Sequence, residues 1–147
     1  MIKYKILFLF FVIPLSVLSQ AKKDFFKNLN AKERNVIVNK GTEYPNTGKY
    51  NKHFEKGTYH CKACDSPLYK SNSKFESNCG WPSFDDEIEN AIKRYPDYKL
   101  GYKRVEICCA KCGGHLGHVF EGENFTDKNV RHCVNSISLI FKPEKKN

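Results

Sequence analysis

The sequence predicts a mainly β domain built from short antiparallel strands. Short segments in which apolar and polar residues alternate recur along the chain, and clusters of Gly, Pro and Asn separate them. Strands and helices do not alternate in the way that builds a parallel sheet. Two Cys-x-x-Cys pairs, Cys61–Cys64 and Cys109–Cys112, each sit at a turn next to a strand candidate. A strand, such a turn and a returning strand form a knuckle that holds half of a metal site.

The N-terminus resembles a targeting segment rather than part of the fold. Lys3 and Lys5 precede the apolar run 6–18, which is shorter than the roughly 20 residues that span a bilayer. We therefore expect a signal peptide at residues 1–19 and an exported protein, periplasmic or secreted, with one domain over 20–147. The alternative is an uncleaved membrane anchor.

Charge is spread along the chain rather than concentrated. The 147 residues include 25 Lys and Arg against 16 Asp and Glu, a net charge of +9. Because the lysines are scattered, the pattern favours solubility over a nucleic-acid groove, and we expect no nucleic-acid partner. A single small domain is expected to be a monomer.

Two short helices are expected. Asn30 and Glu33 form a capping-box pattern, which predicts a helix over 31–40 that stops at Gly41. A second helix is expected over 85–94, where acidic residues at the start suit the helix dipole.

The remaining elements are strands and loops. Strands are expected at residues 58–62, 68–70, 103–109, 116–120 and 130–141, with loops at 41–57, 75–84, 95–102 and 121–129. The tail over about 142–147 is expected to be disordered.

The seven cysteines cannot all pair with one another. Two Cys-x-x-Cys pairs match the tetrahedral thiolate set that Zn²⁺ prefers, so we expect one structural zinc. Two disulfides, or one redox-active pair, are the alternatives; a thioredoxin-like site would begin a helix after a strand, and neither pair has that setting. The expected zinc ligands are Cys61, Cys64, Cys109 and Cys112.

Cys133 is the candidate reactive thiol. Arg131 and Asn135 flank it, and His115 and His118 lie on a strand that can pair with its own. A cysteine with histidine and asparagine neighbours is a nucleophile with its acid and its orienting group. Alternatively, Cys133 is a small buried apolar residue and the histidines are additional metal ligands.

Cys79 is the candidate partner of that thiol. A sulfenic acid condenses with a second thiol to give a disulfide, and a Gly-flanked loop suits a resolving cysteine that must move. The alternative is a plain loop thiol.

Five segments together resemble methionine-(R)-sulfoxide reductases of the MsrB type, over roughly residues 30–141. They are GTEYPNTGKY, the 61–64 knuckle, SKFESNCGWPSF, RVEICCAKCGGHLGHVF and RHCVNSISLIF. The resemblance implies two antiparallel sheets with short N-terminal helices and a four-cysteine zinc knuckle pair. It also implies that residues 20–147 are one MsrB-type catalytic domain.

The resemblance further implies an activity: reduction of protein-bound methionine-(R)-sulfoxide through a Cys133 sulfenic acid and a Cys79–Cys133 disulfide, which a thioredoxin-like reductant reopens. The implied site residues are Cys133 as nucleophile, Cys79 as resolving thiol, His118 and His115 as proton donors, Asn135 and Arg131 as supporting groups, and Trp81 and Phe120 at the substrate.

Three positions depart from the family pattern. His132 replaces a more usual tyrosine beside the nucleophile and can alter the thiolate pKa. Cys108 is an extra thiol next to a zinc ligand and can scramble with it, and Tyr102 stands where Met is frequent. Two other classes remain as alternatives, a zinc-knuckle binding module without catalysis and a Cys–His–Asn hydrolase.

Overall fold

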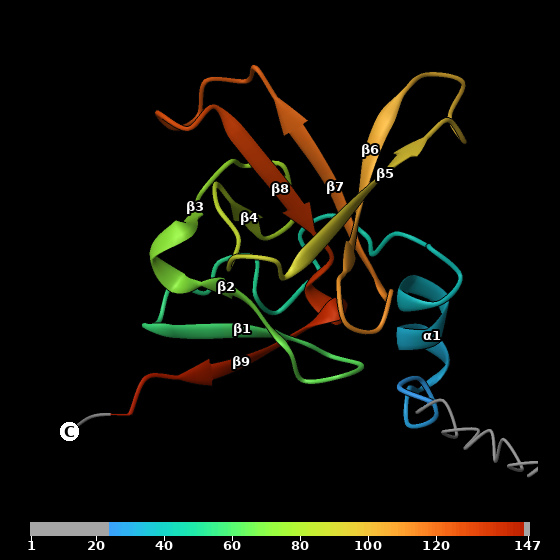
Figure 1. Cartoon of the computed structure of the whole chain (residues 1–147). Helices are drawn as coiled ribbons and strands as arrows, with labels where there is room; N and C mark the ends of the chain where they lie inside the picture. Colours follow the sequence, from blue (N-terminus) through green and yellow to red (C-terminus); the bar gives the residue numbers. More distant parts are fainter. Residues whose placement is uncertain (1–23, 146–147) are drawn as a thin grey trace, which may run out of the picture.

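Two antiparallel sheets and one short α-helix form the described part of the chain, residues 24–145 of this computed structural model (Figure 1). The smaller sheet has the order β2 (Pro67–Lys70), β1 (Gly57–Cys61), β9 (Leu139–Pro143). The larger has the order β3 (Lys74–Phe75), β4 (Ser83–Phe84), β8 (Val130–Val134), β7 (His115–Glu121), β6 (Arg104–Cys109), β5 (Ile92–Asp97). The described residues also contain two 3₁₀ helices, Ser71–Ser73 and Ser136–Ser138. The mainly β prediction with two antiparallel sheets is confirmed.

The N-terminal helix α1 (Ala31–Ile37) has the predicted cap. The Asn30 side chain accepts a hydrogen bond from the Glu33 N–H (3.0 Å), and the Glu33 carboxylate accepts one from the Asn30 N–H (3.0 Å). The helix ends at Ile37 rather than at Lys40, after β-branched residues that lose rotamer freedom in a helix. Where the resemblance implied several N-terminal helices, the described residues contain this single α-helix.

The helix expected over 85–94 is wrong. Residues 92–97 form β5, which pairs with β6 from Ile92 opposite Cys109 to Asp97 opposite Arg104. This long-range pairing overrides the local helical signal. The missing N–H of Pro96 is tolerated because β5 is an edge strand.

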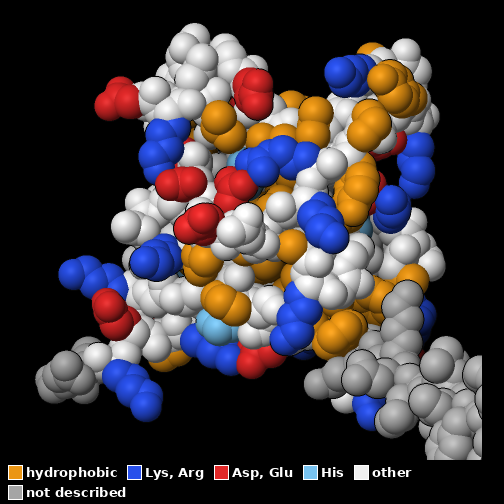
Figure 2. All heavy atoms as spheres, in the orientation of Figure 1, with side chains coloured by type: hydrophobic (Ala, Val, Ile, Leu, Met, Phe, Trp, Pro, Cys, Tyr) orange, Lys and Arg blue, Asp and Glu red, His pale blue; other side chains and the backbone are white. Residues whose placement is uncertain are grey.

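The loop expected over 95–102 is shorter than predicted, because β5 continues to Asp97. The tip between β5 and β6 exposes apolar side chains, visible at the end of this hairpin in Figure 2. Those of Tyr98, Leu100 and Tyr102 are all more than half exposed.

The strand expected over 130–141 is also wrong as a single element. The chain leaves the larger sheet after Val134, passes through the second 3₁₀ helix and enters the smaller sheet as β9. The Ser136 hydroxyl accepts a hydrogen bond from the Tyr50 N–H (2.9 Å), and the Ser138 hydroxyl donates one to the His115 carbonyl (3.0 Å). These hydroxyls fix the crossing between sheets. Strand β9 runs to Pro143, so the tail begins later than expected.

The core lies between the sheets and is largely aromatic. Tyr59, Tyr69 and Phe84 are fully buried, and the Tyr69 and Phe84 rings stack with centroids 4.3 Å apart. One face of the larger sheet packs here, through Ile107 and Val119 among others. The opposite face of the larger sheet is not part of this core.

The expected signal peptide, residues 1–19, lies outside the described residues. Within residues 24–145, no helix has the length and apolar character needed to cross a membrane.

Candidate active site and metal centre

A row of side chains crosses the larger sheet on the face opposite the core. Ser83 pairs with Cys133, Cys133 with His118, His118 with Glu106, and Glu106 with Tyr95. Directly paired residues of an antiparallel ladder point to the same face. The register therefore brings the candidate nucleophile and a candidate proton donor together from β8 and β7.

An irregularity in β7 puts both histidines on this face. Residues three apart in a regular strand point to opposite faces. Here Ile107 pairs with Gly117 and Cys108 pairs with His115, so Leu116 is an extra residue, as in a β-bulge. The rings of His115 and His118 lie 5.6 Å apart as a result.

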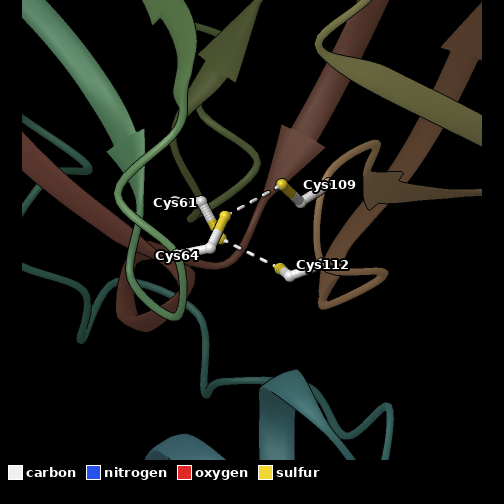
Figure 3. A group of neighbouring side chains, drawn as sticks. All are labelled: Cys61, Cys64, Cys109 and Cys112. Carbon is white, nitrogen blue, oxygen red and sulfur yellow. Dashed lines mark hydrogen bonds between the residues drawn. The ribbon is translucent and has the colours of Figure 1, made fainter. Parts of the chain in front are cut away.

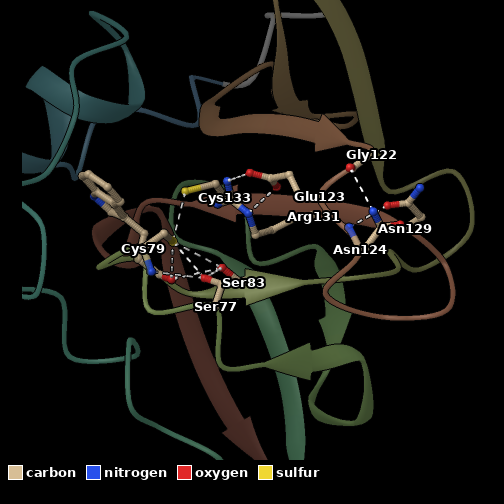
Figure 4. A network of polar contacts seen from close by, with 10 residues as sticks. Ser77, Cys79, Ser83, Gly122, Glu123, Asn124, Asn129, Arg131 and Cys133 are labelled. Carbon is tan, nitrogen blue, oxygen red and sulfur yellow. Dashed lines mark hydrogen bonds and ion pairs between the residues drawn. The ribbon is translucent and has the colours of Figure 1, made fainter.

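Cys133 and Cys79 form a close thiol pair, with 3.9 Å between their sulfur atoms. Figure 4 shows Cys79 also facing the hydroxyls of Ser77 (3.0 Å) and Ser83 (3.5 Å). The hydrogen bond from Cys133, with those hydroxyls, lowers the pKa of Cys79 to about 4. The same bond, together with burial, raises the pKa of Cys133. The two thiols therefore share one proton through this bond, and one of them ionises more readily than an isolated thiol.

Arg131 is the cation beside this pair. Its guanidinium holds the Glu123 carboxylate through two hydrogen bonds (2.7 and 2.9 Å) and lies over the Phe120 ring at 4.6 Å. Its charge lowers the pKa of Cys133, against the opposing effects of Cys79 and burial. Its Nη1 is buried and has no hydrogen-bond partner in the described chain, so donor capacity remains near the thiols.

His115 and His118 each form a hydrogen bond with a carboxylate. His115 Nδ1 lies 2.7 Å from Glu106 Oε1, and the other oxygen of Glu106 accepts from Lys40 (2.7 Å). Burial lowers the pKa of His115, although Glu106 opposes the effect. His118 Nε2 lies 2.8 Å from Asp97 Oδ2.

A pocket of about 130 Å³ opens at the nucleophile. It is lined by Thr42, Trp81, Arg104, Gly117, His118, Phe120, Cys133 and Asn135. Five expected site residues thus share one cavity, whereas Cys79, His115 and Arg131 are not part of its lining. A larger hollow, about 660 Å³, lies at the smaller sheet and has no cysteine in its lining.

Glu43 organises the rim of this pocket. Its N–H donates to Asn135 Oδ1 (2.9 Å), its carbonyl accepts from the Trp81 indole (2.9 Å), and its carboxylate accepts from the Ser136 N–H (2.8 Å). Asn135 also donates to the Leu116 carbonyl (3.0 Å) and so braces the bulge.

Five residues at the site were not among the expected site residues: Glu43, Thr42, Asp97, Arg104 and Glu106. Arg104 and Glu106 lie two residues apart in the strand expected over 103–109, but no local pattern indicates that Glu106 is only 5% exposed.

Four sulfur atoms form a cluster between the two sheets (Figure 3). The sulfur of Cys61 lies 3.6 Å from that of Cys112, that of Cys64 lies 3.5 Å from that of Cys109, and all four are within 4.8 Å of one another. Zn–S bonds of about 2.3 Å in a tetrahedron separate the sulfurs by about 3.8 Å. The group can therefore hold a metal ion of this size.

His132 is not beside the nucleophile in space. Strand alternation turns it into the core, where it meets the Tyr69 hydroxyl (3.1 Å) and Arg94 (3.1 Å). Burial lowers the pKa of His132 to about 4. His132 was expected to alter the pKa of the Cys133 thiolate directly, but its hydrogen bonds go to Tyr69 and Arg94 and not to Cys133.

Cys108 is likewise separated from the metal cluster. Its sulfur faces Glu106 (3.4 Å), and burial raises the pKa of its thiol to about 12. A buried, protonated thiol is a poor partner for exchange with the adjacent ligand Cys109.

The described chain combines two antiparallel sheets, a four-cysteine cluster that can hold a metal ion, and a close pair of thiols, Cys79 and Cys133. The SelR domain matches residues 29–143. Peptide methionine sulfoxide reductase B2, chloroplastic, from Arabidopsis thaliana is 56% identical over 79% of this chain and 57% of its own length. Peptide methionine sulfoxide reductase B5 from the same plant is 46% identical over 88% of this chain and 92% of its own length.

A third relative comes from Saccharomyces cerevisiae: peptide methionine sulfoxide reductase 2 is 53% identical over 74% of this chain and 68% of its own length. The chain therefore belongs to the SelR-domain family of B-type methionine sulfoxide reductases, as the sequence resemblance indicated. It spans little more than half of the chloroplastic relative.

A solved structure of another protein has a similar fold. The Mis18 'Yippee-like' domain superimposes with a TM-score of 0.51 at 16% identity, over 63% of this chain and all of that one. At this identity the likeness concerns the fold alone.

Proposed function

We propose that this protein reduces methionine-(R)-sulfoxide in oxidised proteins to methionine. The observation that carries the proposal is the position of Cys133, which lines the pocket with Cys79 only 3.9 Å away. A nucleophile open to substrate with a second thiol within reach is the arrangement that a sulfenic acid mechanism needs.

In the first step the Cys133 thiolate attacks the sulfoxide sulfur. The oxygen passes to Cys133, one proton is taken up, methionine leaves and Cys133 becomes a sulfenic acid. The sulfoxide gains two electrons and Cys133 loses two. The Cys79 thiol then attacks the Cys133 sulfur, water leaves and a disulfide forms. A dithiol reductant of the thioredoxin type returns both cysteines to thiols.

The attack needs the negative charge of the thiol pair on Cys133, because Cys133 lines the pocket and Cys79 does not. Transfer of the Cys133 proton to Cys79 over their shared hydrogen bond produces the Cys133 thiolate and leaves Cys79 protonated. Arg131 stabilises the new charge, and its buried Nη1 supplies a donor.

The remaining residues take roles at the substrate. His118 lines the pocket and supplies the proton to the sulfoxide oxygen, with His115 behind it and Asn135 at the wall. Trp81 and Phe120 provide apolar surface for the methyl group and side chain of the substrate.

Cys61, Cys64, Cys109 and Cys112 would hold one Zn²⁺. With four protein ligands there would be no open position on the ion, so it would contribute folding free energy rather than chemistry.

Residues 1–19 would direct export, with cleavage before Gln20 leaving one catalytic domain that acts as a monomer in the periplasm or outside the cell. N-terminal sequencing of the protein recovered from a secreting host tests this directly. A chain that still begins at residue 1 in a membrane fraction would favour the anchor instead.

Activity is tested with chromophore-tagged methionine sulfoxide and dithiothreitol, each epimer separately. We expect turnover of the R epimer only. No turnover of either epimer, in protein that still binds one zinc, would favour the zinc-knuckle binding module.

Three cysteine variants test the roles. Cys133→Ser should lose activity with any reductant, because the attacking sulfur is gone. Cys79→Ser should keep activity with dithiothreitol and lose it with a thioredoxin-type reductant, since only the disulfide is accessible to the latter. Cys108→Ser is the matched control. Full activity of Cys133→Ser would contradict the mechanism.

A further inference from the structure

We propose that Asp97, held by Arg104, is a positioning residue that fixes the ring orientation of His118 for proton delivery to the sulfoxide oxygen. The proposal rests on the function proposed above. It assigns a role to the hairpin of β5 and β6, which contributes no nucleophile.

The geometry is that of a chain of three side chains from adjacent strands. Arg104 Nη2 lies 2.6 Å from Asp97 Oδ2, and the same oxygen lies 2.8 Å from His118 Nε2. All three side chains are largely buried, with 18%, 10% and 14% of their surface exposed. Hydrogen bonds between ionised groups in such surroundings are stronger than between neutral ones.

Contacts other than the one with His118 hold Asp97 in place. Its Oδ1 accepts from the Lys99 N–H (3.0 Å) in the turn that follows β5, and the strand register sets Asp97 opposite Arg104. The Lys99 N–H, with His118 and Arg104, holds the pKa of the Asp97 carboxyl well below its usual range. The carboxylate is therefore ionised at neutral pH.

This bond selects one nitrogen of His118 for the substrate. With the Nε2 proton directed at Asp97, the other nitrogen, Nδ1, has no hydrogen-bond partner within the described chain. When the ring is doubly protonated, Nδ1–H is the proton left for a sulfoxide oxygen in the pocket that His118 lines. A carboxylate on one nitrogen orients the ring and stabilises the imidazolium, as in hydrolase triads.

Other charges also face His118. His115 lies beside it, Glu106 lies opposite it on β6, and Cys133 lies opposite it on β8. A small cavity of about 40 Å³ behind the ring is lined by Lys40, Thr42, Asp97, Lys99, Arg104, Glu106, His115 and His118. Among these groups Asp97 is the one in direct contact with His118 Nε2.

The test compares Asp97→Asn with Asp127→Asn, an exposed aspartate in the loop between β7 and β8. Removing the charge of Asp97 should lower kcat by about tenfold to a hundredfold with KM within about twofold, because proton donation weakens while the pocket stays intact. Asp127→Asn should match the wild type.

A second variant separates positioning from support of the hairpin. Arg104→Gln removes the guanidinium but leaves the Asp97 carboxylate on His118 Nε2, so kcat should fall less than in Asp97→Asn. A variant that only loosened the hairpin would raise KM as well. A kcat of Asp97→Asn equal to that of Asp127→Asn would overturn the proposal.

An activity-independent readout keeps the two proposals distinguishable. Nitrogen-15 spectra of neutral His118 should show the proton on Nε2 in the wild type and a mixture of tautomers in Asp97→Ala. The same mixture in the wild type would overturn the positioning role. A wild-type protein that shows the Nε2 tautomer yet fails to reduce the R epimer would overturn the proposed function alone.

Discussion

His132 and Cys133 show how much a single step along a strand changes a residue's surroundings. Cys133 faces the pocket, while His132 is fully buried between Tyr69 and Arg94. Arg94 donates to Nε2, so the neutral ring keeps its proton on Nδ1 and donates it to the Tyr69 oxygen. His132 is thus a core hydrogen-bonding residue whose protonation would place a second positive charge beside Arg94.

This gives a prediction for stability against pH. The pKa of His132 is about 4 in the folded protein and near 6.5 in an unfolded chain. Between these values the unfolded state binds more protons, so the free energy of unfolding should fall by roughly 2–3 kcal/mol as pH drops through the window. Above about pH 6.5 both states are neutral and this contribution no longer varies.

Chemical denaturation at several pH values checks it, with His132→Gln for comparison. Glutamine can still accept from Arg94 and donate to Tyr69 but does not titrate, so its slope should be shallower. Metal ligands protonate in both proteins and cancel in the comparison. Equal slopes would assign the acid sensitivity to other groups.

At the scale of elements, the β7 bulge builds the site. It turns His115 onto the face of His118, and it lies where β7 and β8 run closest. A Cβ on Gly117 would lie 1.9 Å from the Cys133 carbonyl oxygen, closer than any real contact. The glycine is required by this approach of two backbones.

Gly117→Ala should therefore cost about 2–4 kcal/mol of unfolding free energy and most of the activity, because the strands must separate at the nucleophile. Thermal unfolding and R-epimer turnover measure both effects. Gly101→Ala is the control: its Cβ would meet open space, so only its positive φ opposes the change, at about 1 kcal/mol. Equal losses in the two variants would contradict the steric account.

At the scale of the whole molecule, the four-cysteine cluster joins the two sheets. Cys61 ends β1 in the smaller sheet, and Cys109 ends β6 in the larger one. The other two cysteines lie on the turns that follow. A metal ion held here would tie β1 of the smaller sheet to β6 of the larger one, in addition to the aromatic core and the two 3₁₀ helices that connect the sheets.

Metal removal should therefore destabilise the fold rather than block the chemistry directly. We expect one zinc per chain, and a loss of at least about 10 °C in Tm after chelation or in Cys112→Ser. Elemental analysis and calorimetry check both, with Cys108→Ser keeping the metal and the Tm. Unchanged melting after complete metal loss would show that the cluster is dispensable.

Local patterns in the sequence were enough for the mainly β class, the capped helix and the four thiols that can hold a metal. Each of these depends on spacing within a few residues, which the chain fixes before it folds. Neighbouring residues made Cys133 and Cys79 candidate reactive thiols, and the resemblance to a family implied their roles as nucleophile and resolving thiol.

The tertiary structure alone decided β5, the crossing between sheets after Val134 and the bulge in β7. It also decided the carboxylate partners of the two histidines and the burial of His132. Each of these depends on pairing between residues distant in sequence, and the free energy of such pairing exceeds the local preferences of Asp85–Arg94 or of a continuous strand. The sequence therefore indicates the candidate site residues, but the groups that orient them are identified only when the strands are placed side by side.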